Sequence, residues 1–280
     1  MLAENPRNDP TDDRSHPFPL RQGLALAHAV GIDLDFFGQI TPGEPGIVIV
    51  AVVAFGAGLI RGFTGFGGPA FILAILTLFF TPYSIVSKVL VVDFFASAYL
   101  FRACYRSIDW RATLTMVIPT LLLMPLGHWA LLELDAGSMK RIISLVIALA
   151  CTVMLAGYRY RQPMSRNTMM AVGAIAGTVF GGSYIALIAV VAILMGPYDK
   201  VEGRTLIISW SFFTIIGFAL ISTISGTTGV DDVVTALPGA ITYLLGAWLG
   251  SYGFGKSSET LFRRAAISTL LALAVFNLAS

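Results

Sequence analysis

The chain has 280 residues, of which 56% are hydrophobic and 12% are charged, and its formal net charge is +2. A soluble domain usually carries about 25% charged residues, so the composition excludes an ordinary water-soluble protein and predicts a membrane protein. The charge balance gives no basic surplus for nucleic acid, and the three His and two Cys residues are scattered, so we expect no metal site, no cofactor and no disulfide framework.

The N-terminal segment, residues 1–45, begins with charged residues and prolines and lacks the apolar core of a cleavable signal peptide. Residues 21–40 alternate apolar and polar side chains, which is typical of an amphipathic helix lying on the membrane surface. A loosely ordered tail explains the same residues equally well. Both interpretations are kept for this tail.

Six apolar segments are each long enough for one membrane-spanning helix, which needs roughly 20 residues. They are residues 86–105, 113–132, 139–157, 205–224, 233–252 and 261–278. Two further segments, 46–80 and 168–195, are too long for one crossing and contain glycine runs, RGFTGFGGPA (61–70) and GTVFGGSY (177–184). Because glycine permits backbone angles that other residues avoid, each predicts a broken helix or a re-entrant hairpin.

These two segments open similar halves of the chain. GFGGP is followed by TPYSIV in the first half, and VFGGS is followed by GPYDKV in the second. The pattern predicts an all-α membrane protein with two repeats, residues 46–157 and 168–280, joined by a cytoplasmic linker at 158–167. Each repeat would be a glycine-broken or re-entrant helix followed by three transmembrane helices.

Basic residues in short connections favour the cytoplasmic side of a membrane. They cluster in three connections, whereas the two connections between these carry acids. The basic residues are Arg102, Arg106 and Arg111, then Arg159, Arg161 and Arg166, then Lys256, Arg263 and Arg264, and the acids are Glu133, Asp135, Asp231 and Asp232. If each broken segment returns to the side it came from, the repeats are inverted, an arrangement common in secondary transporters with a binding site near the midplane.

A helix that starts inside the membrane presents unpaired N–H groups and partial positive charge, and such an end attracts an anion. The glycine runs would let an oxyanion approach the backbone there. Tight helix packing against small residues is the alternative explanation of the same glycines. The substrate-binding residues expected at the two runs are Gly65, Gly67 and Gly68 in the first half and Gly181, Gly182 and Ser183 in the second.

Charges inside apolar segments cost roughly 2.5 to 3.5 kcal/mol each on insertion scales, so they are functional candidates. Lys88 and Arg204 hold nearly matching places in the two halves, and we predict that they close a cationic site around the anion. Snorkelling to the interface is the alternative for both. Asp93 lies deeper in its helix and is predicted to couple transport to proton uptake and release, unless it forms a static pair with Lys88 or another base.

Three further residues have supporting roles in this hypothesis. Arg61 precedes the first glycine run, where it would hydrogen-bond exposed carbonyls or line the access path. Ser209 and Trp210 would add a hydroxyl donor and a wall to the binding site. A packed helix face explains Ser209 and Trp210 almost as well.

The run RGFTGFGG, followed by TPYSIV, an apolar stretch with Asp93 and the loop SIDWR (107–111), resembles the TauE/SafE family of sulfite and organosulfonate transporters, also called toluenesulfonate uptake permeases. The resemblance covers about residues 46 to 280, although GGS at 181–183 lacks the proline that follows Gly68. It implies that the transported anion is sulfite or an organosulfonate. Together with the two glycine breaks and Asp93, it gives the hypothesis of a secondary transporter of the cell inner membrane that works by alternating access and is coupled to a proton or another cation.

The residues alone predict an anion and not its chemistry, so a carrier for a small carboxylate or phosphonate is an alternative. An anion channel is another, because glycine-lined breaks also form filters. An enzyme is not expected, since the apolar segments contain no paired acids, Ser-His dyad or metal-ligand cluster. The motif GxxxxGK[ST] is absent, which argues against direct use of ATP.

Overall fold

The computed structural model describes residues 45–76, 82–133, 160–184, 186–262, 264–266 and 268–269, and all regular structure in these ranges is helical. Nearly all of the predicted N-terminal tail, the crossing predicted at 139–157 and most of that at 261–278 lie outside the described residues. The helices are α2 (Pro45–Thr64), α3 (Gly68–Leu76), α4 (Pro82–Cys104), α5 (Trp110–Glu133), α7 (Arg166–Ser183), α8 (Leu187–Leu194), α9 (Lys200–Ile224) and α10 (Val230–Lys256), with a 3-10 turn η2 (Tyr105–Ser107) before α5.

Three of the described helices are long and apolar enough to cross a membrane, namely Trp110–Ala130, Lys200–Ile224 and Asp232–Lys256. Their outward faces expose large apolar side chains such as Leu122, Leu220 and Leu245. A helix satisfies its own backbone hydrogen bonds, so such a face is stable against lipid. The prediction of an all-helical membrane protein is confirmed.

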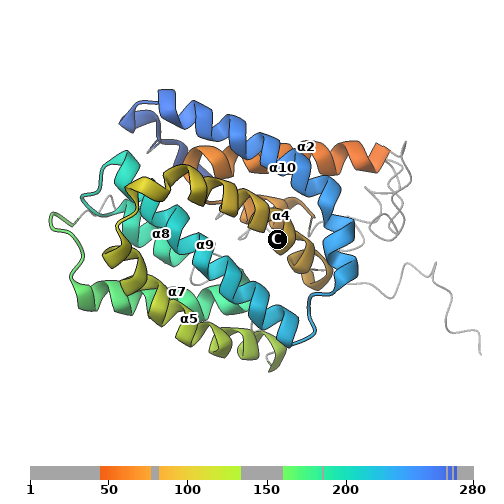
Figure 1. Cartoon of the computed structure of the whole chain (residues 1–280), viewed down its shortest axis with the longest axis horizontal. Helices are drawn as coiled ribbons and strands as arrows, with labels where there is room; N and C mark the ends of the chain where they lie inside the picture. The colour runs from red at the N-terminus through yellow and green to blue at the C-terminus, as the bar shows by residue number, and fades with distance from the viewer. Residues whose placement is uncertain are drawn as a thin grey trace, which may run out of the picture.

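Two long helix pairs form the sides of the molecule, α2 with α10 and α5 with α7 (Figure 1). Small residues spaced four apart let the backbones approach closely in both pairs. A Cβ added at Gly62 would lie 2.1 Å from the carbonyl oxygen of Ala247, and one at Gly177 would lie 2.3 Å from that of Thr120. Each pair therefore joins a helix of one predicted half to a helix of the other.

The helices run in two opposite directions. The last residues of α4 and α10 lie near the first residues of α9, because Cys104 interacts electrostatically with Arg204 and the Lys200 ammonium donates to the carbonyl of Ser257. At the other end of α4, Ser87 donates to the carbonyl of Thr227, just past the end of α9. Hence α2, α4 and α10 run toward the end of the molecule at which α5, α7 and α9 begin.

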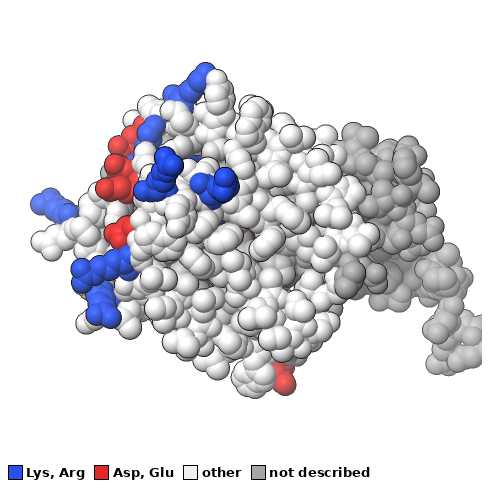
Figure 2. Space-filling model, viewed as in Figure 1, with Lys and Arg blue, Asp and Glu red and all other residues white. Residues whose placement is uncertain are grey.

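Exposed basic side chains gather at this end, which we call the basic end. Figure 2 shows the visible Lys and Arg side chains there together with several acids, while most of the remaining described surface in view is uncharged. Glu133 lies at the opposite end of α5. The described basic residues of the three predicted clusters are Arg102, Arg106, Arg111, Arg161, Arg166, Lys256 and Arg264.

Both predicted helix breaks are present. The first separates α2 from α3 at residues 65–67, and the second lies between the end of α7 at Ser183 and the start of α8 at Leu187. Gly65 and Gly67 have φ angles of 85° and 83°, in the left-handed region that glycine alone adopts without strain. At the second break the left-handed residue is Tyr184, with φ 57°, and Gly181 and Gly182 belong to the last turn of α7.

Candidate functional site

The break between α2 and α3 frees backbone carbonyls inside the protein. The N–H of Phe66 bonds to the Thr64 hydroxyl at 3.2 Å, so it cannot serve the carbonyl of Gly62 one helical turn earlier. That carbonyl accepts instead from the Arg204 guanidinium, and the carbonyl of Gly65 accepts from Arg61. Arg61 thus makes the carbonyl contact expected from the sequence.

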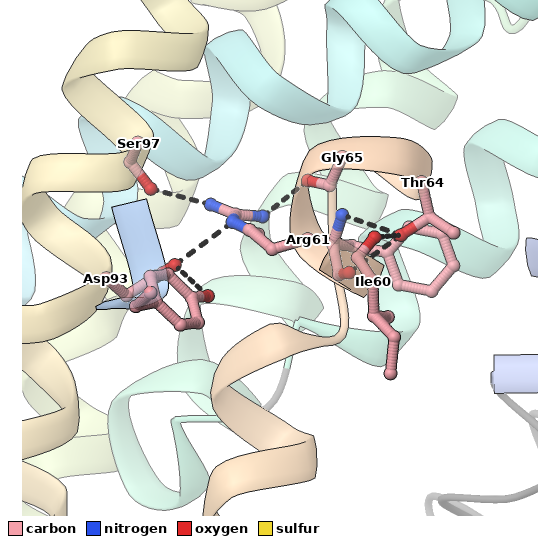
Figure 3. Close-up of polar contacts among 8 residues, drawn as sticks. Ile60, Arg61, Thr64, Gly65, Asp93 and Ser97 are labelled. Atoms are coloured by element: carbon pink, nitrogen blue, oxygen red, sulfur yellow. Dashed lines mark hydrogen bonds and ion pairs between the residues drawn. The ribbon is translucent and has the colours of Figure 1, made fainter. Parts of the chain in front are cut away.

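Arg61 is also the centre of a buried ion pair. Its Nε lies 3.0 Å from Oδ1 of Asp93, and its Nη2 donates to the Ser97 hydroxyl at 2.7 Å. The Tyr243 hydroxyl donates to the same Oδ1 at 2.8 Å. Figure 3 shows the Arg61 guanidinium between Asp93 and Ser97 of α4 and the carbonyl of Gly65.

This network is shielded from solvent. Arg61 and Asp93 are each 2% exposed, and Ser97 and Tyr243 are fully buried. Removing one partner of a buried ion pair typically costs about 3 to 5 kcal/mol, because the remaining charge is left uncompensated. Asp93 is therefore held in place by Arg61 and by Tyr243.

Tyr184, at the second break, interacts with the same network. It caps α7 in the left-handed conformation and is 3% exposed, and its hydroxyl has no hydrogen-bond partner among the described residues. The hydroxyl interacts electrostatically with Asp93 and Arg61. A buried hydroxyl without a partner is unfavourable, and among the described residues the Tyr184 hydroxyl is such a group.

Arg204 approaches the break from the basic end. Its side chain packs against Gly65, where an added Cβ would lie 3.1 Å from Cγ of Arg204, and its guanidinium lies 4.2 Å from the ring centre of Phe254. Nη2 donates to Gly62 and, at 3.2 Å, to Ser251, whereas the buried Nε has no hydrogen-bond partner among the described residues. Arg204 and Arg61 also interact electrostatically, so two buried guanidinium groups share the first break.

Lys88 is not brought to Arg204. It lies one residue from Ser87, which contacts Thr227 beyond the end of α9, whereas Arg204 lies near the beginning of α9. Because α4 and α9 run in opposite directions, matching positions in the two halves fall at opposite ends of the molecule. The predicted pairing of Lys88 with Arg204 is therefore not formed.

Ser209 and Trp210 face α5. The Ser209 hydroxyl lies 2.8 Å from that of Thr113, and the Trp210 indole N–H donates to the Thr120 hydroxyl at 3.0 Å. Both side chains are fully buried. Ser209 and Trp210 thus form hydrogen bonds between α9 and α5, which is what a packed helix face would show.

The second glycine run packs along α5. A Cβ added at Gly181 would lie 2.2 Å from the carbonyl oxygen of Met124. The Ser183 hydroxyl donates to the carbonyl of Val179 in its own helix, at 2.7 Å. By contrast, Gly68 begins α3, and a Cβ there would lie 2.2 Å from the Tyr243 hydroxyl.

Sequence reasoning missed Tyr243, Ser97 and Tyr184 as members of the site. Ser97 lies one turn after Asp93 on the same helix, a spacing that places both side chains on one face and was available in the sequence. Tyr243 reaches Asp93 only through tertiary packing and lies in no recognisable motif. Tyr184 is the last residue of the run GTVFGGSY, but its electrostatic interaction with Asp93 depends on tertiary packing that the run does not specify.

Comparison with known proteins gives one match. The family model described as Sulfite exporter TauE/SafE matches residues 50–277, which covers all of the described helices except the first residues of α2. No curated protein and no solved structure matches the chain.

Proposed function

Because the chain belongs to the TauE/SafE sulfite exporter family, and is therefore a multi-pass membrane transporter and not an enzyme, we propose that it moves sulfite or an organosulfonate across the cell inner membrane as a secondary transporter. The family name supports the sulfur-containing substrate. The proposed cycle is alternating access around the break between α2 and α3.

The observation that carries this proposal is the pair of buried guanidinium groups at that break. Arg61 and Arg204 are 2% and 7% exposed, and each donates to a carbonyl freed by the broken helix. A guanidinium is a planar fork of donors that suits an oxyanion such as a sulfonate. Gly65 carries no side chain and Arg204 packs against it, so an anion held by Arg204 would lie next to the backbone of the break.

We assign separate roles to Arg204 and Asp93. The unpartnered Nε of Arg204 makes this residue a direct contact of the anion, and Arg61 borders the path to it. Asp93 repels an anion when it is charged, so its role is coupling, through a proton taken up and released in the cycle. Lys88 lies toward the far end of α4 from Arg204, so we assign it no contact with the anion.

The helix directions support an inverted repeat. Helices α2, α4 and α5 of the first half correspond in order to α7, α9 and α10 of the second, and each runs opposite to its counterpart. The pairing of α2 with α10 mirrors that of α7 with α5. In transporters built this way, rocking of one unit against the other exposes a central site to each side in turn.

A binding panel tests this function. Purified full-length protein in nanodiscs should bind sulfite or methanesulfonate more tightly than acetate or methylphosphonate, measured by calorimetry. Liposome uptake of the preferred anion should saturate and depend on an ion gradient. A preference for carboxylates would reject the sulfur assignment, and flux that neither saturates nor follows a gradient would indicate a channel.

A further inference from the structure

The Asp93 carboxylate occupies the position that an oxyanion ligand of Arg61 would take. One of its oxygens, Oδ1, meets the Arg61 Nε at 3.0 Å and the Tyr243 hydroxyl at 2.8 Å. That hydroxyl lies against Gly68, the first residue of α3. The carboxylate is thus held by a guanidinium and a phenol beside the start of an intramembrane helix, which are the donors that a sulfonate or sulfite needs.

The charge of Asp93 and an incoming anion exclude each other at Arg61. The three nitrogens of the guanidinium are engaged by Asp93, by the carbonyl of Gly65 and by the hydroxyl of Ser97. A second anion beside a charged carboxylate is strongly repelled in a medium of low dielectric constant. A proton on Asp93 removes both obstacles, because a neutral carboxyl holds Arg61 weakly and does not repel the anion.

We infer that Arg61 is a second cation that binds the transported anion, and that Asp93 is a built-in competitor which leaves Arg61 only when it is protonated. This inference rests on the proposed function. It predicts that the proton and the anion cross the membrane in the same direction. The proton that neutralises Asp93 comes from the aqueous side to which the site is open, and it travels with the anion. The transporter is therefore a proton–anion symporter with one proton for each anion.

The other groups around Asp93 fit this scheme. Helix α2 contributes Arg61, α10 contributes Tyr243, the end of α7 contributes Tyr184, and α9 contributes Arg204, which acts on Arg61. The residues of α3, GPAFILAIL, carry no titratable side chain. Asp93 is thus the sole acid among these groups, and the two tyrosine hydroxyls remain to bind the anion once Asp93 is neutral.

Methanesulfonate is a suitable probe because its own charge does not change over the pH range of the experiment. Wild-type affinity should fall about tenfold per pH unit on the alkaline side, where each binding event must protonate Asp93. Asp93→Asn should bind at every pH with the affinity that the wild type reaches at low pH. In weakly buffered solution on this alkaline side, wild-type protein should take up about one proton per anion bound and Asp93→Asn none.

Controls separate this inference from a structural role of the ion pair. Asp199→Asn removes an exposed acid but keeps a residue that caps α9, so it should leave proton uptake at the wild-type value. The double variant Arg61→Gln with Asp93→Asn leaves neither member of the ion pair charged without its partner, so it should fold. It should bind at least tenfold more weakly than Asp93→Asn alone. Binding by the double variant equal to that of Asp93→Asn would remove Arg61 from the site.

If Asp93→Asn does not fold, Tyr243→Phe provides the test. It keeps the ion pair but removes a hydrogen bond to the charged carboxylate, so the pH at which binding falls should move up by about one unit. Tyr252→Phe, an exposed tyrosine of the same helix, should leave that pH unchanged. No shift in Tyr243→Phe would overturn the competition at Asp93.

The outcomes for the two proposals are distinguishable. Wild-type binding of methanesulfonate without proton uptake on the alkaline side would overturn the inference and leave the proposed function standing. Binding of acetate alone would reject the sulfur assignment, and the proton count on acetate would still decide the inference. Binding of no anion in the panel would reject both.

Discussion

The break between α2 and α3 and the break between α7 and α8 follow similar glycine runs but are built for different tasks. At the first, Gly65 and Gly67 supply left-handed backbone, and Arg61 and Arg204 satisfy the freed carbonyls. At the second, Gly181 lets α7 pack closely on α5, and the turn falls on Tyr184. The comparison teaches that one glycine pattern permits a left-handed break in one half and close helix packing in the other.

The largest effect should follow from breaking the charge balance at the first break. Arg61→Gln leaves Asp93 buried without its cation, and we expect a loss of about 3 to 5 kcal/mol in the free energy of unfolding. The double variant Arg61→Gln with Asp93→Asn should recover most of this loss. Denaturant unfolding in detergent measures both, and equal stability of the single and double variants would show that the pair contributes little.

Packing at the second break should give the next largest effect. Gly181→Ala brings a methyl group against the Met124 carbonyl, so we expect a loss of stability of about 1 to 3 kcal/mol with anion affinity unchanged in the folded fraction. Gly56→Ala is the matched control, since nothing lies within 4 Å of its added Cβ. Weakened binding without a loss of stability would place the anion at the second glycine run after all.

Arg204 should affect binding more than folding. Arg204→Ala removes a charge-assisted hydrogen bond, so we expect an affinity for methanesulfonate about tenfold to a hundredfold weaker. Arg111→Ala removes an exposed arginine from the same end of the molecule and should bind normally. Calorimetric titration measures the methanesulfonate affinity of both variants. Normal binding by Arg204→Ala would leave Arg204 only the structural role of donating to the Gly62 carbonyl.

The smallest effect concerns Tyr184, the residue through which the second break reaches the first. Tyr184→Phe removes a buried hydroxyl without a partner, so stability should stay equal or rise. Affinity should fall about two- to tenfold if the hydroxyl binds the anion. Opposite signs for the two measurements distinguish a ligand donor from a packing residue, and unchanged affinity would confine the site to the first break.

The sequence was sufficient for the local features of this molecule. Apolar runs and glycine clusters placed the described helices and both breaks, because length, periodicity and backbone freedom are properties of short segments. Asp93 and Arg61 were also recognisable singly, since a charge in an apolar segment is rare.

The contacts between segments were beyond sequence reasoning. Superposing the two halves suggested that Lys88 meets Arg204, but antiparallel packing of α4 and α9 separates residues at matching positions. Tyr243 is 150 residues from Asp93 and lies in an ordinary apolar helix. Its partner is decided by how α10 lies against α2, which no local pattern specifies.

Each long helix pair joins one helix from each half, α2 with α10 and α5 with α7, and this has a consequence for biosynthesis. The glycine face of α2 is synthesised well before α10, the helix that covers it. Until α10 arrives, that face is uncovered and Asp93 lacks its hydrogen bond from Tyr243, so both must wait in the bilayer or be shielded by the insertion machinery. Neither half can therefore complete its helix packing before the other half is synthesised, and the two halves fold together.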